Sequence, residues 1–291
     1  MRFLPLGPGA PTVSVVGYGG MHLSIDGRPT EDVSLRVIHA ALDAGATLLD
    51  TANVYCLDDA DLGHNERLMA TALRTWTGPR EGILVATKAG LTRPGGRWER
   101  DARPASLRAA CDRSLRALGV DRIALYQLHA PDPQVPLEDS LGAMAELQRA
   151  GKVRWIGLSN VSVAEIDRAG RVVSVVSVQN RLNPFFREAI TDGVVRICGE
   201  RGIGFLAYSP TGGGRLTKKL PGHPVLQRIA ARLGITPHQV CLAWVLAQGP
   251  SVIAIPSART TGHAVDSLKA AAVGLAPGDL HDIDAAEFSR A

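Results

Sequence analysis

The sequence predicts a parallel α/β barrel of the (β/α)8 type. Short apolar runs rich in Val, Ile and Leu alternate with longer segments of helical periodicity, a pattern typical of parallel strands joined by helical crossovers. Seven strand–helix units are clear, and an eighth is predicted over residues 13–44. Eight units in 291 residues give about 36 residues each, which suits a closed barrel. No linker or low-complexity segment interrupts this pattern, so we expect one domain spanning residues 1–291.

An antiparallel hairpin is expected ahead of the barrel. Residues 3–16 carry apolar side chains around Gly7-Pro8-Gly9, which is a turn composition. The stretch from Val13 to Gly17 is either the return strand of this hairpin or the first barrel strand. The other strands are predicted from apolar runs at residues 47–51, 83–88, 123–129, 153–159, 172–179, 203–209 and 252–256.

Helices are predicted where apolar residues recur at intervals of three and four. They fall at residues 31–44, 65–76, 106–118, 138–150, 164–169, 192–201, 225–233, 237–248, 263–272 and 277–287. Glycine follows several of them, as at Gly45, Gly119 and Gly151, where a helix commonly ends. The helices beyond the last strand are expected to be C-terminal additions to the barrel.

The charge and hydropathy patterns argue against nucleic acid or a membrane as a partner. The net charge is +4 and the pI about 9.0, but Lys and Arg are scattered and not interleaved with aromatic residues, which predicts a solvated surface. The N-terminus lacks the apolar stretch of a signal peptide. The most apolar region, Val240 to Pro256, is interrupted by Gln248-Gly249-Pro250 and is too short for a membrane span. We expect a cytoplasmic protein.

The cysteine pattern predicts no disulfide and no metal site. The four cysteines, Cys56, Cys111, Cys198 and Cys241, form no CxxC pair and no cluster with histidine. This usage agrees with a reducing compartment.

Four polar residues lie where successive predicted strands end. Asp50, Lys88 and His129 each close an apolar run, and Tyr55 follows Asp50 by five residues. In a parallel barrel these strand ends share one mouth, where active sites are found. Such a group suits proton transfer to a carbonyl oxygen while a nicotinamide supplies a hydride.

Each of the four residues has a plausible chemical task. A free phenol titrates near pH 10, so Tyr55 needs help to act as an acid at neutral pH. An ammonium group at Lys88, paired with Asp50, is expected to lower the phenol pKa. His129 is expected to donate a hydrogen bond to the substrate oxygen. The alternative is that Asp50 and Lys88 form a purely structural ion pair.

Two glycine-rich segments do not fit nucleotide-binding motifs. The run Gly17-Tyr18-Gly19-Gly20 has His22 at the third glycine position of a dinucleotide fingerprint. The run Gly212-Gly213-Gly214 precedes Lys218-Lys219 without the spacing of a phosphate-binding loop. Both are interpreted as turn glycines.

A series of short motifs follows along the chain. They are Leu49 to Tyr55 (LDTANVY), Asn65-Glu66, Ala86-Thr87-Lys88, Asp121 to His129 (DRIALYQLH), Pro131-Asp132-Pro133, Gly151 to Asn160 (GKVRWIGLSN), Val178-Gln179-Asn180, Leu206 to Pro210 (LAYSP) and Ile255-Pro256. In this order they resemble the aldo-keto reductase family over essentially the whole chain. The resemblance implies a (β/α)8 barrel with Tyr55 as the acid. Asp50 and Lys88 would tune its acidity, and His129 would orient the carbonyl.

The resemblance also implies a cofactor site. Ser159, Asn160 and Gln179 would hydrogen-bond the nicotinamide carboxamide, and Tyr208 would stack on the ring. The segment from Ser209 through Pro210 and Gly212 to Leu216 would run over the pyrophosphate, where exposed glycine amides suit an anion.

The adenine end departs from the family pattern. Ser257 stands where Gly or Lys is usual, His263 where Arg or Gln is frequent, and Asp266-Ser267 replaces a Glu-Asn pair. Arg259 remains and, with Ser257, is suited to a 2′-phosphate; amides at the start of the helix near Thr261 face the same anion. NADP(H) is therefore favoured, with NAD(H) and a surface role for Arg259 left open.

Five residues and one segment are predicted to wall the substrate pocket: Met21, His22, Cys56, Leu57, Trp98 and residues 130–136. For Cys56 the favoured interpretation is nevertheless a loop cysteine without a role. Trp98 has Arg93, Arg97 and Arg100 for neighbours, which would suit an anionic substrate, although a solvated loop is the favoured interpretation.

The sequence thus predicts an NADPH-dependent reductase of aldehydes or ketones, with a small-molecule carbonyl compound as its partner. A monomer or a weak homo-oligomer is expected. One alternative is a nicotinamide-binding sensor or accessory subunit with little turnover. Another is a lyase forming a Schiff base at Lys88. The pocket walls are variable loops, so the substrate itself is not predicted.

Overall fold

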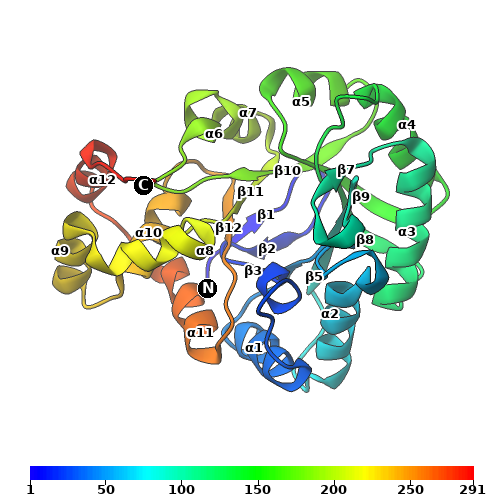
Figure 1. Ribbon diagram of the computed structural model, residues 1–291. Helices are drawn as coiled ribbons and strands as arrows, with labels where there is room; N and C mark the ends of the chain where they lie inside the picture. Colours follow the sequence, from blue (N-terminus) through cyan, green and yellow to red (C-terminus); the bar gives the residue numbers. More distant parts are fainter.

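The computed structural model describes residues 1–291 and contains a closed barrel of parallel strands (Figure 1). Its eight-stranded sheet has the order β3-β4-β5-β8-β9-β10-β11-β12. The strands are β3 (Tyr18–Gly19), β4 (Leu48–Asp50), β5 (Leu84–Ala89), β8 (Ile123–Leu128), β9 (Val153–Ser159), β10 (Val175–Arg181), β11 (Gly204–Tyr208) and β12 (Val252–Ile255). A parallel bridge between Val16 and Ala254 joins the two edges. The predicted (β/α)8 fold is therefore confirmed.

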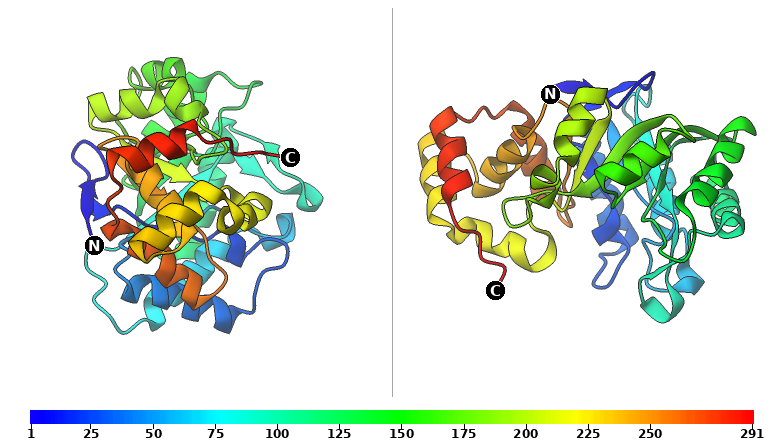
Figure 2. Two further views of the ribbon diagram at one scale, coloured as in Figure 1. Left: turned by 90° about the vertical axis from the view of Figure 1, so that its left-hand side faces the viewer. Right: turned by 90° about the horizontal axis from the view of Figure 1, so that it is seen from above.

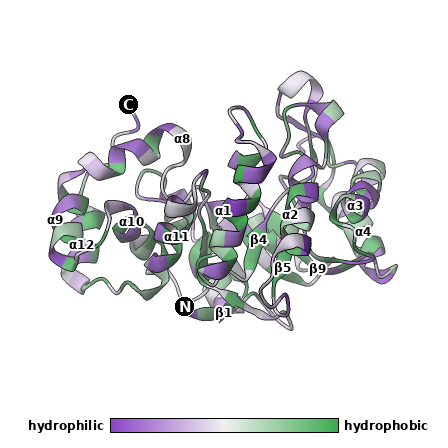
Figure 3. Ribbon diagram, turned by 90° about the horizontal axis from the view of Figure 1, so that it is seen from below, coloured by the Kyte–Doolittle hydropathy of each residue, from purple (hydrophilic) through white to green (hydrophobic).

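Helices surround the sheet, as the alternating pattern predicts. Those of the barrel units are α1 (Glu31–Asp43), α2 (His64–Thr75), α3 (Pro104–Leu118), α4 (Leu137–Arg149), α5 (Val163–Ala169), α7 (Val194–Arg201), α10 (Pro237–Leu246) and α11 (Thr261–Lys269). Additional helices α9 (Pro224–Leu233) and α12 (Pro277–Ala285) pack together beside α10 on one side of the barrel (Figure 1). Figure 3 shows apolar residues concentrated on the barrel strands, whereas the surrounding helices mix hydrophobic and hydrophilic residues.

The predicted N-terminal hairpin is present and closes one end of the barrel. Strands β1 (Phe3–Pro5) and β2 (Thr12–Ser14) pair antiparallel, and the chain continues directly into Val16 and β3. Leu6 is fully buried, and its carbonyl accepts a hydrogen bond from Gly204 N at 3.0 Å. Gly7 lies so close to β10 that an added Cβ would be 2.0 Å from Val176 O. The opposite end, at the carboxyl ends of the strands, stays open.

Several elements differ from prediction. A short hairpin of β6 (Leu91–Thr92) and β7 (Glu99–Arg100) was not expected, because strands of two residues carry no periodic signal. The helix predicted at 192–201 is α7 and begins at Val194. A short helix that was not predicted, α6 (Glu188–Thr191), precedes it, with Gly193 between them at φ +78°. Strand β10 begins three residues later than predicted.

The C-terminal residues turn back from α12 towards α8 (Gly213–Leu216) and the residues after it (Figure 2). Arg215 donates a hydrogen bond to Arg290 O at 2.5 Å, and Lys219 donates one to Ser289 O at 3.3 Å. No single helix is both long and apolar enough to span a membrane; α9 and α10 pass that test only as a pair, and they are bent by 95°.

Candidate active site

One cavity of about 730 Å³ opens at the carboxyl ends of the strands and extends to α11. Most of the side chains predicted for the site line it. They are Met21, His22, Asp50, Tyr55, Trp98, His129, Ser159, Asn160, Gln179, Tyr208, Ser209, Pro210, Ser257, Arg259, His263 and Asp266. Residues from both halves of the chain therefore meet at one mouth.

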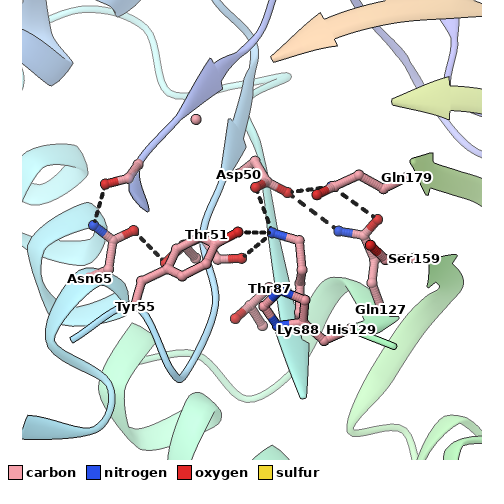
Figure 4. Close-up of polar contacts among 12 residues, drawn as sticks. Asp50, Thr51, Tyr55, Asn65, Thr87, Lys88, Gln127, His129, Ser159 and Gln179 are labelled. Atoms are coloured by element: carbon pink, nitrogen blue, oxygen red, sulfur yellow. Dashed lines mark hydrogen bonds and ion pairs between the residues drawn. The ribbon is translucent and has the colours of Figure 1, made fainter. Parts of the chain in front are cut away.

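Asp50, Tyr55 and Lys88 form a buried hydrogen-bonded cluster at the base of the cavity (Figure 4). Lys88, which ends the apolar run of β5, has no exposed surface. Its Nζ lies 2.6 Å from Asp50 Oδ2 and 2.9 Å from the Tyr55 hydroxyl, and it also donates to Thr51 O at 3.0 Å. All three donors of the ammonium group are thus used.

The electrostatics of this cluster correct the prediction for the phenol. Burial raises the pKa of Tyr55 above its ordinary value, and this effect outweighs the opposing influence of the Lys88 ammonium. Burial alone would lower the pKa of Lys88, but Asp50 and Tyr55 raise it overall. Tyr55 is therefore a neutral phenol held beside a charged ammonium group. The sequence could not reveal this balance, because it depends on how completely the loops exclude water.

His129 and Trp98 surround the phenol with two further rings. The His129 ring centroid lies 5.8 Å from that of Tyr55 at 81°, and Trp98 lies 6.4 Å from Tyr55 and 6.5 Å from His129. Burial and the Lys88 charge hold the pKa of His129 well below its usual range, so the imidazole is neutral. Its buried Nδ1 has no hydrogen-bond partner. A neutral imidazole with its proton on Nε2 presents a donor.

The predicted carboxamide ligands lie next to this group. Ser159 ends β9, and Asn160 follows it in the left-handed conformation, with φ 57°, which Asn tolerates better than most residues. Asn160 Nδ2 donates to His129 O at 2.9 Å, and Asn160 Oδ1 accepts from the Tyr208 hydroxyl at 2.9 Å. These contacts fix the side chain between the ends of β8 and β11.

Gln179 is hydrogen-bonded to the cluster of Asp50, Tyr55 and Lys88. Its Nε2 donates to Asp50 Oδ1 at 2.8 Å. The same carboxylate oxygen lies 3.4 Å from Nε2 of Gln127, which sequence reasoning did not single out. Its signal is present in the sequence, because strand alternation places Gln127, two residues before His129, on the interior face.

The predicted pyrophosphate segment has the backbone needed for an anion cradle, with one correction. Ser209, Gly212 and Gly213 have positive φ values of 48°, 95° and 68°. Gly212 does not line the cavity, because its Cα faces the protein and an added Cβ would lie 2.9 Å from Leu216 Cβ. Thr211, Gly213 and Gly214 line it instead.

The side chains predicted to bind the adenine end of the cofactor are largely hydrogen-bonded to other residues of the protein. Arg259 donates from Nε to His22 O at 3.1 Å and from a terminal nitrogen to Asp26 O at 2.9 Å. Both carboxylate oxygens of Asp266 are also engaged, by Thr236 Oγ1 at 2.8 Å and Gln239 Nε2 at 2.7 Å.

Other groups at this end remain exposed or were not predicted. Ser257 Oγ donates to Gly19 O at 2.5 Å, while the His263 side chain is exposed. Lys218, Thr217 and His238 also line the cavity. The Lys218 side chain is exposed and has no ion-pair or hydrogen-bond partner; the lysines after the glycine run were its only signal.

Three predicted pocket walls are wrong. Cys56, Leu57 and the segment 130–136 do not line the cavity. The Cys56 side chain points into the protein, where its Sγ donates to Val54 O at 3.3 Å and Asp58 O at 3.1 Å, and burial raises its thiol pKa to about 11. Leu57 contributes its carbonyl to Arg93 at 2.9 Å. Sequence proximity to Tyr55 does not fix side-chain direction in an irregular loop.

Trp98 is the wall that the short β6–β7 hairpin supplies. It is 46% exposed and lines the cavity. The Arg93 guanidinium lies 4.1 Å from the centre of its ring. Arg93 is itself buried and bonds to loop carbonyls, and Arg97 pairs with Glu99 at 2.9 Å. These two arginines are therefore engaged within the fold.

Comparisons with known proteins agree with this architecture. The family model described as "Aldo/keto reductase family" matches residues 15–287. The aldo-keto reductase str7 of Strobilurus tenacellus is 33% identical over 92% of this chain and 87% of its own length. The glycerol dehydrogenase AKR11B4 from Gluconobacter oxydans has a TM-score of 0.85 at 28% identity, covering 97% of this chain and 94% of that one.

A solved relative carries a nicotinamide nucleotide. An aldo/keto reductase from Klebsiella pneumoniae, crystallised with NADP and acetate, has a TM-score of 0.81 at 27% identity, covering 98% of this chain and 95% of its own. The match to the family model spans almost the whole barrel. Asp50, Tyr55, Lys88 and His129 lie at the open end of that barrel. The chain therefore belongs to the aldo/keto reductase family of NAD(P)H-dependent oxidoreductases.

Proposed function

We propose that this protein reduces an aldehyde or ketone to the alcohol with NADP(H), and that Tyr55 is the general acid. The observation that carries the proposal is the contact of the Tyr55 hydroxyl with Lys88 Nζ at 2.9 Å, inside a cluster that opens on the cavity. The neutral His129 ring stands beside it, 5.8 Å between centroids. A protonated phenol next to a fixed cation is suited to give up its proton as negative charge develops nearby.

When bound, the nicotinamide supplies a hydride to the carbonyl carbon. Tyr55 breaks its O–H bond and transfers that proton to the carbonyl oxygen, which becomes the alcohol hydroxyl. The resulting phenolate is stabilised by the ammonium group of Lys88, which Asp50 keeps charged. His129 donates a hydrogen bond to the same oxygen, and Trp98 excludes water from one side of the site.

The residues present fit a nicotinamide dinucleotide. Side-chain amides at Asn160 and Gln179 and the Ser159 hydroxyl gather at one end of the cavity, beside the aromatic ring of Tyr208. Gly213 and Gly214 supply bare backbone farther along it. The cations Arg259 and Lys218 at the far end favour a 2′-phosphate. The Klebsiella relative crystallised with NADP supports the same preference.

The environment of Lys88 argues against a lyase. A Schiff base requires a neutral, accessible amine. Lys88 is fully buried, its three donors are engaged, and its pKa is raised by Asp50 and Tyr55 despite burial. The same environment suits a fixed cation.

The test is a fluorescence titration of the protein with NADPH and, separately, NADH, followed by addition of 4-nitrobenzaldehyde. We expect tighter binding of NADPH and loss of nicotinamide absorbance on adding the aldehyde. Binding without oxidation across a broad carbonyl panel would favour the sensor or accessory-subunit alternative. Failure to bind either nucleotide would contradict the proposed cofactor site.

A further inference from the structure

Gln127 lies inside the barrel between the two functional halves of the site. Strand register pairs it with Lys88 of β5 on one side and with Gly157 of β9 on the other. Its side chain has no exposed surface. Gly157 leaves room for it, since an added Cβ there would lie 2.9 Å from Gln127 Cγ. The interior is therefore shaped around this amide, which the proposed chemistry has not yet used.

The amide closes a triangle of hydrogen bonds with Asp50 and Gln179 (Figure 4). Gln127 Nε2 lies 3.4 Å from Asp50 Oδ1, and Gln127 Oε1 lies 3.4 Å from Gln179 Nε2. The third side is the 2.8 Å contact between Gln179 Nε2 and Asp50 Oδ1. Both hydrogen bonds of Gln127 are longer than the usual value of about 2.9 Å. They therefore orient the side chains of Asp50 and Gln179 more than they stabilise the fold.

The chemistry of the carboxylate fixes how both amides are turned. An ionised carboxylate only accepts hydrogen bonds, so each glutamine must present its NH2 group to Asp50. The carbonyl of Gln127 is then left to accept the second N–H of Gln179. With both N–H groups committed, Gln179 has only its carbonyl oxygen left for other partners, on a side chain that lines the cavity. Meanwhile Asp50 keeps its other oxygen on Lys88 at 2.6 Å.

We propose that Gln127 is a positioning residue that orients Asp50 towards Lys88 and fixes the amide of Gln179, so that the proton-donating and ring-binding parts of the site are held in register. This inference rests on the proposed function, because it concerns the groups that would transfer the proton and bind the nicotinamide. Gln127 itself touches neither.

The alternative is that Gln127 only fills space, and a near-isosteric replacement separates the two roles. Gln127→Met keeps the volume and removes both hydrogen bonds, so a space-filling residue would tolerate it. We expect instead that the Kd for NADPH rises severalfold and that turnover at saturating NADPH falls about tenfold, the lower range for a hydrogen bond to a charged group. Gln148→Met is the matched control, because Gln148 is a half-buried glutamine on α4 whose side chain bonds only to Arg154 O, away from the cavity.

A double-mutant cycle tests whether Gln127 acts through its two partners. In an Asp50→Asn background, Gln127→Met is expected to change turnover less than twofold, because the carboxylate it orients is gone. In a Gln179→Met background, the same substitution is expected to leave the NADPH Kd nearly unchanged. Full, additive losses in both backgrounds would overturn the proposal, as would wild-type binding and turnover in Gln127→Met.

A second variant and a separate binding measurement keep the test decisive. If Gln127→Met fails to fold, Gln127→Asn replaces it, since it keeps an amide withdrawn by one methylene and is expected to show the same losses. If the unsubstituted protein binds NADPH but reduces no carbonyl compound, the proposed function fails, and the NADPH cycle with Gln179 still decides the role of Gln127. Absence of nucleotide binding overturns both.

Discussion

The two ends of the cavity are built differently. At the Tyr55 end, the polar side chains come from strands or from residues just after them, are mostly buried, and bond to one another. At the α11 end, Arg259, His263 and Lys218 come from loops and a helix start and are exposed. The first end is a rigid charged cluster, and the second is an exposed surface on which Arg259 bonds to loop carbonyls and Lys218 has no partner. Chemistry should therefore depend sharply on single atoms at one end and only gradually on charge at the other.

The largest effect is expected from removing one oxygen at the buried end. Tyr55→Phe keeps the ring and deletes the hydroxyl that contacts Lys88. Loss of a general acid typically lowers turnover by about 10² to 10⁴-fold, while NADPH affinity should stay within about twofold because the other ligands are intact. Stopped-flow reduction and a binding titration measure both. Normal turnover would remove Tyr55 from the mechanism.

A large loss of stability is expected when the buried ion pair is broken on one side. Lys88→Met leaves the Asp50 carboxylate buried without its cation, which typically costs about 3–5 kcal/mol. Urea unfolding would measure it. The double variant Lys88→Met, Asp50→Asn should recover part of this stability but no activity. Equal stability of the single and double variants would mean that the charge is not enclosed as described.

A smaller and selective effect is expected at the exposed end. Arg259→Ala should weaken NADPH about tenfold, the size of a charge-assisted contact, and leave NADH affinity nearly unchanged. The comparison matters because Arg259 also bonds to His22 O and Asp26 O. If the affinity for NADH falls equally, the role of Arg259 is to hold the loop that contains His22 and Asp26. Arg228→Ala, at an exposed ion pair with Asp282, is the control.

The smallest kinetic effect is expected at Cys56. Because its side chain points away from the cavity, Cys56→Ala should leave the KM for any aldehyde within about twofold while lowering Tm, since a buried side chain is truncated. A KM that changes strongly with aldehyde size in this variant would return Cys56 to the pocket wall.

The contrast between the two ends also explains what the sequence could predict. Asp50, Lys88 and His129 are positioned by strands, and strand ends can be found from apolar periodicity. Trp98 lines the cavity, but the short hairpin that carries it was not predicted. The direction of Cys56 and the inward face of Gly212 depend on irregular loops, which periodicity does not describe. Strand alternation places Gln127 on the interior face, but it was missed because a single glutamine in an apolar run matches no motif. The direction of the pKa shift of Tyr55 depends on how completely the side chain is buried, which only the structure shows.

The pH dependence of carbonyl reduction tests the central claim most directly. Tyr55 must carry its proton to act as an acid, and burial raises its pKa above the ordinary phenol value of 10. The rate at saturating NADPH should therefore stay flat on the alkaline side through pH 9 or so, and fall only as the phenol ionises above about pH 10. A decline that begins near pH 7 would contradict a neutral buried phenol as the proton donor.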